Sequence, residues 1–198
     1  MKEFGIDLDL VDRARSMRVL SGAMGPEEVA VRLLLETVAD GDGCVMIPVD
    51  VTAVALQCGL CDAVWVLGDH ARRSQDRMAG FAPAGGMAAV RPMREARFAL
   101  ACEIGRSVYS GMTGGAVDTV GGSGVVDRHG EPVLPSTDPA AWWIGRFGLA
   151  LLMPVQAMLE SWDEGLTING IAELFDVTQL VVWHRALSLD LRSMLEEF

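Results

Sequence analysis

One short stretch of the sequence has residue types and a spacing that suit metal chemistry. The segment REARFALACEIGR, residues 94–106, is largely apolar and carries Glu103 between Cys102 and Arg106. Two ligands four positions apart on a helix share a face and can hold a zinc ion, while an intervening glutamate takes a proton from metal-bound water. A thiolate at Cys102 could bind zinc, but the Arg106 guanidinium has no lone pair and stays protonated. The spacing of a hydrolytic metal site is therefore present without one of its ligands.

This stretch and a second one resemble the ImmA/IrrE family of zinc metallopeptidase-like proteins. The family reads R-x-R-F-T-L-A-H-E-L-G-H, and the segment 94–106 is similar to it, with Cys102 and Arg106 standing at the histidine positions. The run IGRFGLALLMP, residues 144–154, is similar to the family's A-N-R-F-A-A-E-L-L-M-P at the same spacing.

The resemblance extends to the C-terminal part of the chain. IAELFDVT, residues 171–178, followed by Val182 and Arg185, is similar to the family's closing L-A-x-x-F-x-V-S-x-x-A-V-x-x-R segment. With the upstream PVDVTAVA, residues 48–55, the similarity covers residues 44–190. It implies an α+β fold with a zincin-like (ImmA/IrrE-type) core, a small mixed sheet and a C-terminal pair of helices like a helix-turn-helix.

The resemblance also implies a zinc site that this chain has lost. The family's third ligand is a carboxylate just before the A-N-x-F run, and the matching neighbourhood here is Ala141, Trp142 and Trp143. Neither alanine nor tryptophan coordinates a metal, and a lone cysteine does not hold catalytic zinc in the usual geometry. We therefore expect a retired peptidase with no catalytic residue, no metal and no cofactor, in which Cys102, Glu103 and Arg106 are vestigial.

Two interpretations of the Glu103 and Arg106 pair stay open. Their spacing of three places them on one helix face, where they can form an ion pair in a partly buried groove, so that a fixed cation replaces the metal cation. The alternative is a solvated surface pair worth a few tenths of a kcal/mol.

Other cysteines and histidines give weaker signals. The run CGLC, Cys58 to Cys61, has redox or zinc spacing, but a single CxxC without a second pair more often marks buried thiols. A compensating metal site built from His70, His129 and His184 would be a coincidence, because these residues are scattered along the chain.

Composition limits the functions that the chain can have. Its 198 residues suffice for one domain with a real core, and the formal net charge of −11, with one lysine against fifteen arginines, disfavours non-specific nucleic-acid binding. The start, MKEFGIDLDL, lacks the pattern of a signal peptide, so we expect a cytoplasmic protein with free thiols. The apolar run 140–159 carries Arg146 near its middle, which favours a buried core helix over a membrane span.

Periodicity, capping residues and turn residues predict the elements that position these side chains. Helices are expected at 7–20, from Pro26 to a stop at Gly41, at 51–57 behind a cap at Asp50, over the segment that starts at 94, at 140–153 and on through Trp162. Strands are expected at 44–49, 63–67 and 87–90, and a glycine-rich loop at 112–139. We divide the chain into a helical extension (1–42), a degenerate metallopeptidase-like domain (43–165) and a C-terminal helical segment (166–198).

The C-terminal segment has two interpretations. A turn at Asp176 and a cap at Thr178 suit a helix-turn-helix, in which Gln179, His184 and Arg185 would face DNA. The few basic and amide side chains stand among apolar residues, and the charge balance is acidic, so a helical pair packed on the core is the favoured alternative.

We therefore expect a protein that acts by binding another protein. The resemblance implies transcription regulation in a phage or mobile element, with a helix-turn-helix repressor, which active relatives cleave, as partner. The inactive copy would keep the groove beside Cys102, Glu103 and Arg106 and bind the partner without cutting it. An active zinc metallopeptidase with rebuilt ligands and a DNA-binding regulator stay open as alternatives.

Overall fold

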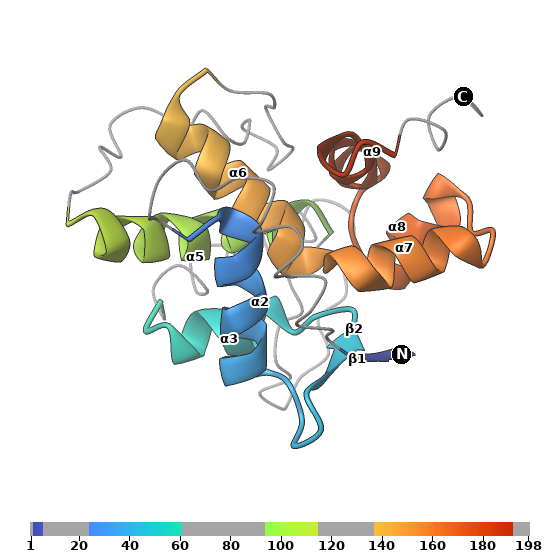
Figure 1. The fold of residues 1–198 in the computed structure, drawn as a ribbon, viewed down its shortest axis with the longest axis horizontal. Helices are drawn as coiled ribbons and strands as arrows, with labels where there is room; N and C mark the ends of the chain where they lie inside the picture. The colour runs from blue at the N-terminus through green and yellow to red at the C-terminus, as the bar shows by residue number, and fades with distance from the viewer. Residues whose placement is uncertain (1, 6–23, 61–93, 115–136, 192–198) are drawn as a thin grey trace, which may run out of the picture.

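The computed structural model describes residues 2–5, 24–60, 94–114 and 137–191, and every structural statement below concerns these residues. They are mostly helical and include a small sheet, which agrees with the expected α+β class. The elements, in chain order, are β1 (Lys2–Gly5), α2 (Pro26–Thr37), β2 (Cys44–Ile47), α3 (Val51–Gln57), α5 (Arg94–Thr113), α6 (Pro139–Leu152), α7 (Val155–Asp163), α8 (Ile168–Phe175) and α9 (Gln179–Ser188) (Figure 1).

The described sheet consists of β1 and β2, which pair in antiparallel fashion. Lys2 lies opposite Ile47, and Gly5 lies opposite Cys44. The sequence predicted β2 but not β1, because a four-residue strand whose partner is distant in the chain has no local signal of its own. The strands predicted at 63–67 and 87–90, and the helix predicted at 7–20, lie outside the described residues.

Local capping explains where the first described helices begin and end. Pro26 occupies the first turn of α2, where its missing N–H costs nothing, and α3 begins behind Asp50, whose carboxylate accepts a hydrogen bond of 3.0 Å from Ala53 N. Helix α2 ends at Thr37, before the predicted stop at Gly41. The Asp40 carboxylate instead organises a turn into β2, accepting bonds from the backbone N–H groups of residues 42 and 44.

Helices α5 and α6 form the most extensive contact among the described elements, and both are close to the predicted bounds. Helix α5 runs to Thr113, past the predicted start of the loop at 112, and residues 115–136 of that predicted loop lie outside the described residues. Helix α6 begins behind Asp138, whose carboxylate accepts from the N–H groups of Ala140 and Ala141 at 3.3 and 3.1 Å. Glycines allow the close approach: a β-carbon on Gly105 would lie 2.7 Å from the Phe147 ring.

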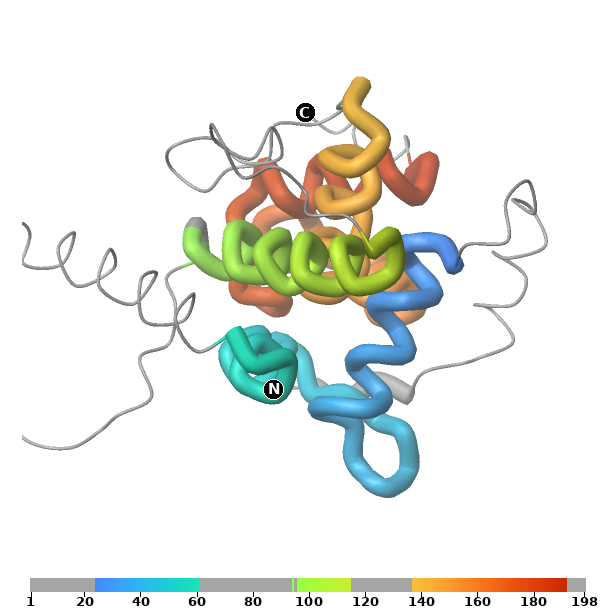
Figure 2. Tube along the Cα trace, turned by 90° about the vertical axis from the view of Figure 1, so that its left-hand side faces the viewer, coloured from blue at the N-terminus to red at the C-terminus, as the bar shows by residue number. Residues whose placement is uncertain are grey.

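The core surrounds α5. Figure 2 shows this helix crossing the molecule, with α3 on one side and α6 on the other, while α2 descends past both. Residues from all these elements form one continuous apolar cluster, which includes Leu34, Val54, Phe98, Phe147 and Phe175.

Helices α8 and α9 are joined by the turn that the sequence predicts. Helix α8 ends at Phe175 and is capped by Asp176, which adopts the left-handed conformation (φ 54°, ψ 49°). Helix α9 begins behind Thr178, whose hydroxyl accepts a hydrogen bond of 3.4 Å from Val181 N. The predicted turn and cap are therefore confirmed. Asparagine and aspartate tolerate the left-handed region better than other side chains, which suits Asp176 to this position.

The apolar helices α6 and α7 bear on whether the described stretches could span a membrane. No single helix there is long and apolar enough to cross a bilayer, although α6 and α7 together, bent by 57° at Pro154, meet the length and composition criteria. Most of α6 is buried inside the protein.

Candidate functional site

The Cys102 thiol lies inside the contact between α5 and α6. The side chain is 1% exposed, and a β-carbon on Gly148 of α6 would lie 3.1 Å from its Sγ. Burial raises the pKa of the Cys102 thiol, the negative charge of Glu103 raises it further, and the positive charge of Arg106 partly opposes the shift. The thiol therefore stays protonated at neutral pH and is oriented toward a neighbouring helix.

Glu103 and Arg106 form the ion pair that their spacing predicts. Arg106 Nε donates to Glu103 Oε2 at 3.2 Å, and Nη2 donates to Oε1 at 3.2 Å. The Arg106 side chain is 12% exposed, whereas that of Glu103 is 43% exposed. The pair is thus intermediate between a buried ion pair and a solvated surface pair, because its cation is largely buried and its carboxylate is partly exposed to solvent. Both carboxylate oxygens accept a hydrogen bond from the guanidinium.

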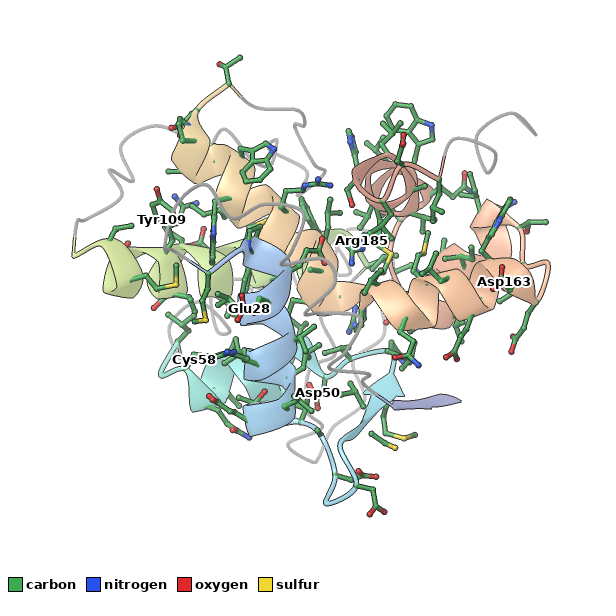
Figure 3. All side chains as sticks on the ribbon, viewed as in Figure 1. Glu28, Asp50, Cys58, Tyr109, Asp163 and Arg185 are labelled. Carbon is green, nitrogen blue, oxygen red and sulfur yellow. The ribbon has the colours of Figure 1, made fainter. Side chains whose placement is uncertain are left out.

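Aromatic rings occupy the place on α6 where the resemblance puts the third ligand. Trp143 is 8% exposed, stacks on Phe147 with ring centroids 5.4 Å apart, and meets Tyr109 of α5 at 5.3 Å. Figure 3 shows Tyr109 on α5 beside α6. Trp142 is half-buried, and the Arg146 guanidinium lies 5.6 Å from its ring centroid. Of these contacts, the one between Tyr109 and Trp143 joins α5 to α6.

The described residues do not assemble a metal site. No three His, Cys, Asp or Glu side chains among them come close enough to share an ion. Asp138, the acidic residue nearest to Ala141 in the sequence, caps α6. Of the CxxC pair, Cys58 is half-buried and burial raises its pKa, while Cys61 lies outside the described residues, as do the loop histidines at 70 and 129.

Two of the three side chains that could have faced DNA, those of His184 and Arg185, are buried, whereas Gln179 is exposed. Arg185 is fully buried: its Nε donates to the Met153 carbonyl oxygen at 2.9 Å, and its Nη atoms donate to the Glu27 carboxylate at 2.5 and 2.9 Å. Figure 3 shows Arg185 on the side of α9 that faces α6. His184 is 8% exposed, and burial lowers its pKa, which keeps it neutral. The Gln179 amide donates to the side-chain oxygen of Asn169 on α8. The burial of His184 and Arg185 therefore agrees with the favoured alternative, a helical pair packed on the core.

Sequence reasoning missed a second buried arginine. Arg97 is 2% exposed, donates to the Val49 carbonyl oxygen at 2.7 Å, and lies 3.9 Å from the Asp176 carboxylate, to which Arg94 also donates at 3.1 Å. These contacts link the start of α5 to the turn between α8 and α9. The available signal was an arginine inside the apolar run RFALA, which calls for a buried partner.

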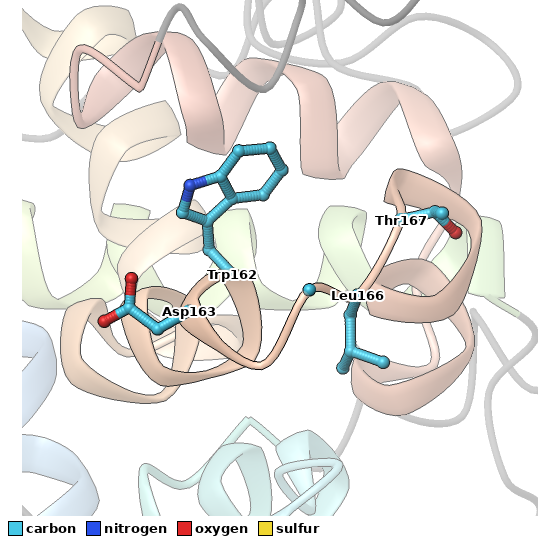
Figure 4. A pocket seen from close by; sticks show the side chains of 5 residues that line it. Trp162, Asp163, Leu166 and Thr167 are labelled. Atoms are coloured by element: carbon cyan, nitrogen blue, oxygen red, sulfur yellow. The ribbon is translucent and has the colours of Figure 1, made fainter.

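Two surface features remain outside this helix contact. A hollow of about 370 Å³ lies between the end of α7 and the start of α8, and Asp163 is the one ionisable side chain among those that line it: Trp162, Asp163, Gly165, Leu166 and Thr167 (Figure 4). The second feature is the outer face of α9, where Leu180, Trp183 and Leu187 are exposed.

Comparison with known proteins gives no match: no family model, no curated protein and no solved structure matches this chain. The similarity to the ImmA/IrrE family therefore rests on the quoted stretches.

Proposed function

We propose that this chain is a catalytically inactive ImmA/IrrE-like protein that regulates by binding another protein, such as a helix-turn-helix repressor. One observation carries the proposal. Arg106 stands where the zinc site needs a lone-pair donor, and it occupies both carboxylate oxygens of Glu103. The guanidinium thus holds the carboxylate that, in a zinc peptidase, would take a proton from metal-bound water.

The contact between α5 and α6 supports the same proposal. A zincin-like core would place the third ligand on α6 facing α5, and in this chain Trp143 of α6 stacks on Phe147 and makes a tilted ring contact with Tyr109 of α5. The Cys102 side chain is 1% exposed and lies against Gly148 of α6 in the same contact. Rebuilding an active site would require three donors, and the described residues offer no such group.

The alternative of a DNA-binding regulator has less support. A recognition helix needs exposed basic or amide side chains, but the arginine and histidine of α9 are buried, and the exposed Gln179 amide is hydrogen-bonded to Asn169. The acidic balance of the chain also repels phosphates. A protein partner therefore fits the C-terminal helices better than a nucleic acid does.

The test combines metal analysis with the fate of a partner. The protein, purified from zinc-supplied cells, is analysed for bound zinc and used to capture its partner from the native host. The captured partner is then purified, mixed with fresh protein and followed by intact mass. The proposal predicts much less than one zinc per chain and a partner that is retained at full length.

The contrary result is specific. About one zinc per chain, lost in Cys102→Ala, with a shortened partner that no longer forms with Glu103→Gln, would establish a peptidase with rebuilt ligands. Arg32→Gln serves as the matched control, because it removes an ion pair within α2 whose Arg32 side chain is 54% exposed.

A further inference from the structure

The outer face of α9 carries an apolar stripe. Leu180, Trp183 and Leu187 are 41, 39 and 40% exposed, respectively. Their spacing of three and then four places them along one face of the helix. The opposite face holds α9 on the core through buried residues such as Val182 and Arg185. Three large exposed apolar side chains in line are typical of a surface that packs against another helix.

The exposed charges of the segment that carries this stripe have a single sign. Between Val155 and Leu191 the exposed ionisable side chains are all carboxylates: Glu160, Asp163, Glu164, Glu173 and Asp190. The arginine of this segment, Arg185, is buried and neutralised by Glu27, and His184 is uncharged because burial lowers its pKa. The three helices α7, α8 and α9 therefore present apolar and acidic groups to solvent over this part of the chain.

We propose that the α9 stripe, Leu180, Trp183 and Leu187, docks a basic amphipathic helix of the partner protein. The partner's apolar face would cover the stripe, and its flanking lysines and arginines would meet the carboxylates of this segment. Complementary charge selects such a partner and speeds its association. The inference rests on the proposed function, since it names the surface and the chemistry by which the partner is bound.

Charge also separates this occupant from two others. A second copy of the chain would bring acidic segments together at the same stripe, which costs energy at short range. A nucleic acid would place phosphates against the same carboxylates. A helix that a DNA-binding protein uses to contact phosphates, by contrast, carries basic side chains and suits this surface.

The experiment uses the full chain and a set of synthetic helical peptides of roughly 18 residues, or five turns. One peptide has a leucine stripe flanked by lysines and arginines, a second has the same stripe flanked by glutamates, and a third has the basic flanks with serines in place of the leucines. Calorimetric titration measures binding at low and at moderate salt. The basic amphipathic peptide is expected to bind at least about tenfold more tightly than either of the others, with affinity falling as salt rises.

Variants assign the binding to the stripe. Trp183→Ser and Leu187→Ser are each expected to lower the affinity for the basic peptide by about tenfold, as substitutions at central apolar anchors do. Glu173→Lys should lower the affinity for the basic peptide and reduce the dependence of that affinity on salt. The matched control is Leu56→Ser, which changes a leucine on α3 that is 47% exposed and should leave the affinity unchanged. Circular dichroism checks that each variant is folded.

Three results would overturn the inference: equal binding of the basic and acidic peptides, equal binding by the stripe variants and the wild type, or a dimer in sedimentation that Trp183→Ser abolishes. None of these outcomes affects the zinc content or the intact mass of a captured partner. Failure of the docking surface is therefore distinguishable from failure of the proposed function.

Discussion

Arg185 and Glu27 form a two-point ion pair although 158 positions separate them in the chain. The pair joins the middle of α9 to the first turn of α2, and Arg185 Nε also donates to the carbonyl oxygen of Met153 where α6 ends. A single guanidinium thus fixes three helices. Because the Arg185 side chain is fully buried, its charge depends on these partners rather than on water.

Replacing this arginine should destabilise the fold. Arg185→Met removes the donors of the Met153 carbonyl and the Glu27 carboxylate, and we expect a loss of about 3 kcal/mol in the free energy of unfolding. Urea denaturation measures it. Arg32→Met is the control on α2, because the Arg32 side chain is 54% exposed and its pair with Glu28 should contribute about 0.5 kcal/mol or less. Equal losses in the two variants would contradict the structural role of Arg185.

The close contact of α5 and α6 gives a paired test. Alanine in place of a helical glycine gains about 1 kcal/mol in propensity. In Gly105→Ala the new β-carbon would lie 2.7 Å from the buried Phe147 ring, so overpacking should outweigh that gain and leave a net loss of about 1 kcal/mol. In Gly111→Ala nothing lies within 4 Å, and a gain of up to about 1 kcal/mol is expected near this helix end. If thermal unfolding gave Gly105→Ala a higher melting temperature than Gly111→Ala, the helices would not be in close contact at Gly105.

Stability at high pH should report the Cys102 thiol. Its pKa in the folded chain lies above the ordinary value of 9.0, chiefly because burial disfavours the thiolate. The unfolded chain loses this proton first, so the contribution of the thiol is complete below about pH 9 and declines as the pH rises, by about 1.4 kcal/mol per unit. Urea unfolding under reducing conditions between pH 8 and 10.5 should show a steeper decline for wild type than for Cys102→Ala. If the free energy of unfolding fell equally steeply with pH in both proteins, the Cys102 thiol would be exposed to solvent in the folded chain.

The acidic surface predicts weak interaction with DNA. In mobility shifts with random duplex at moderate salt we expect no retained band, because few phosphates can be neutralised by exposed cations. Gln179→Ala should make no difference, since the Gln179 amide is engaged with Asn169. Sequence-specific retention that Gln179→Ala removes would restore the DNA-binding interpretation of α9.

Local signals predicted the helices well. Pro26 at the start of α2, the Asp50 cap of α3 and the Thr178 cap of α9 each act within one helical turn, and each lies where the sequence indicated. The Glu103 and Arg106 pair was also predictable, because a spacing of three fixes the two residues on one helix face.

Features that depend on distant parts of the chain were not predictable in the same way. The strand Lys2–Gly5 exists through its pairing with β2, and the burial of Arg185 depends on Glu27 at the other end of the chain. An arginine in a helical pattern carries no sign of whether it faces solvent or a carboxylate. The burial of His184 and Arg185 agrees with the favoured interpretation of a helical pair packed on the core, but the sequence did not indicate which carboxylate receives the arginine.

The proximity of Gly105 to Phe147 has an evolutionary consequence. A larger side chain at 105 is compatible with the fold only if the ring at 147 is replaced by something smaller, and the same holds for Gly148 against Cys102 and Phe98. In an alignment of related sequences these positions should therefore covary, with total volume conserved across the two helices rather than residue identity at either one. Such compensation would identify relatives of this chain even where Cys102, Glu103 and Arg106 have all been replaced.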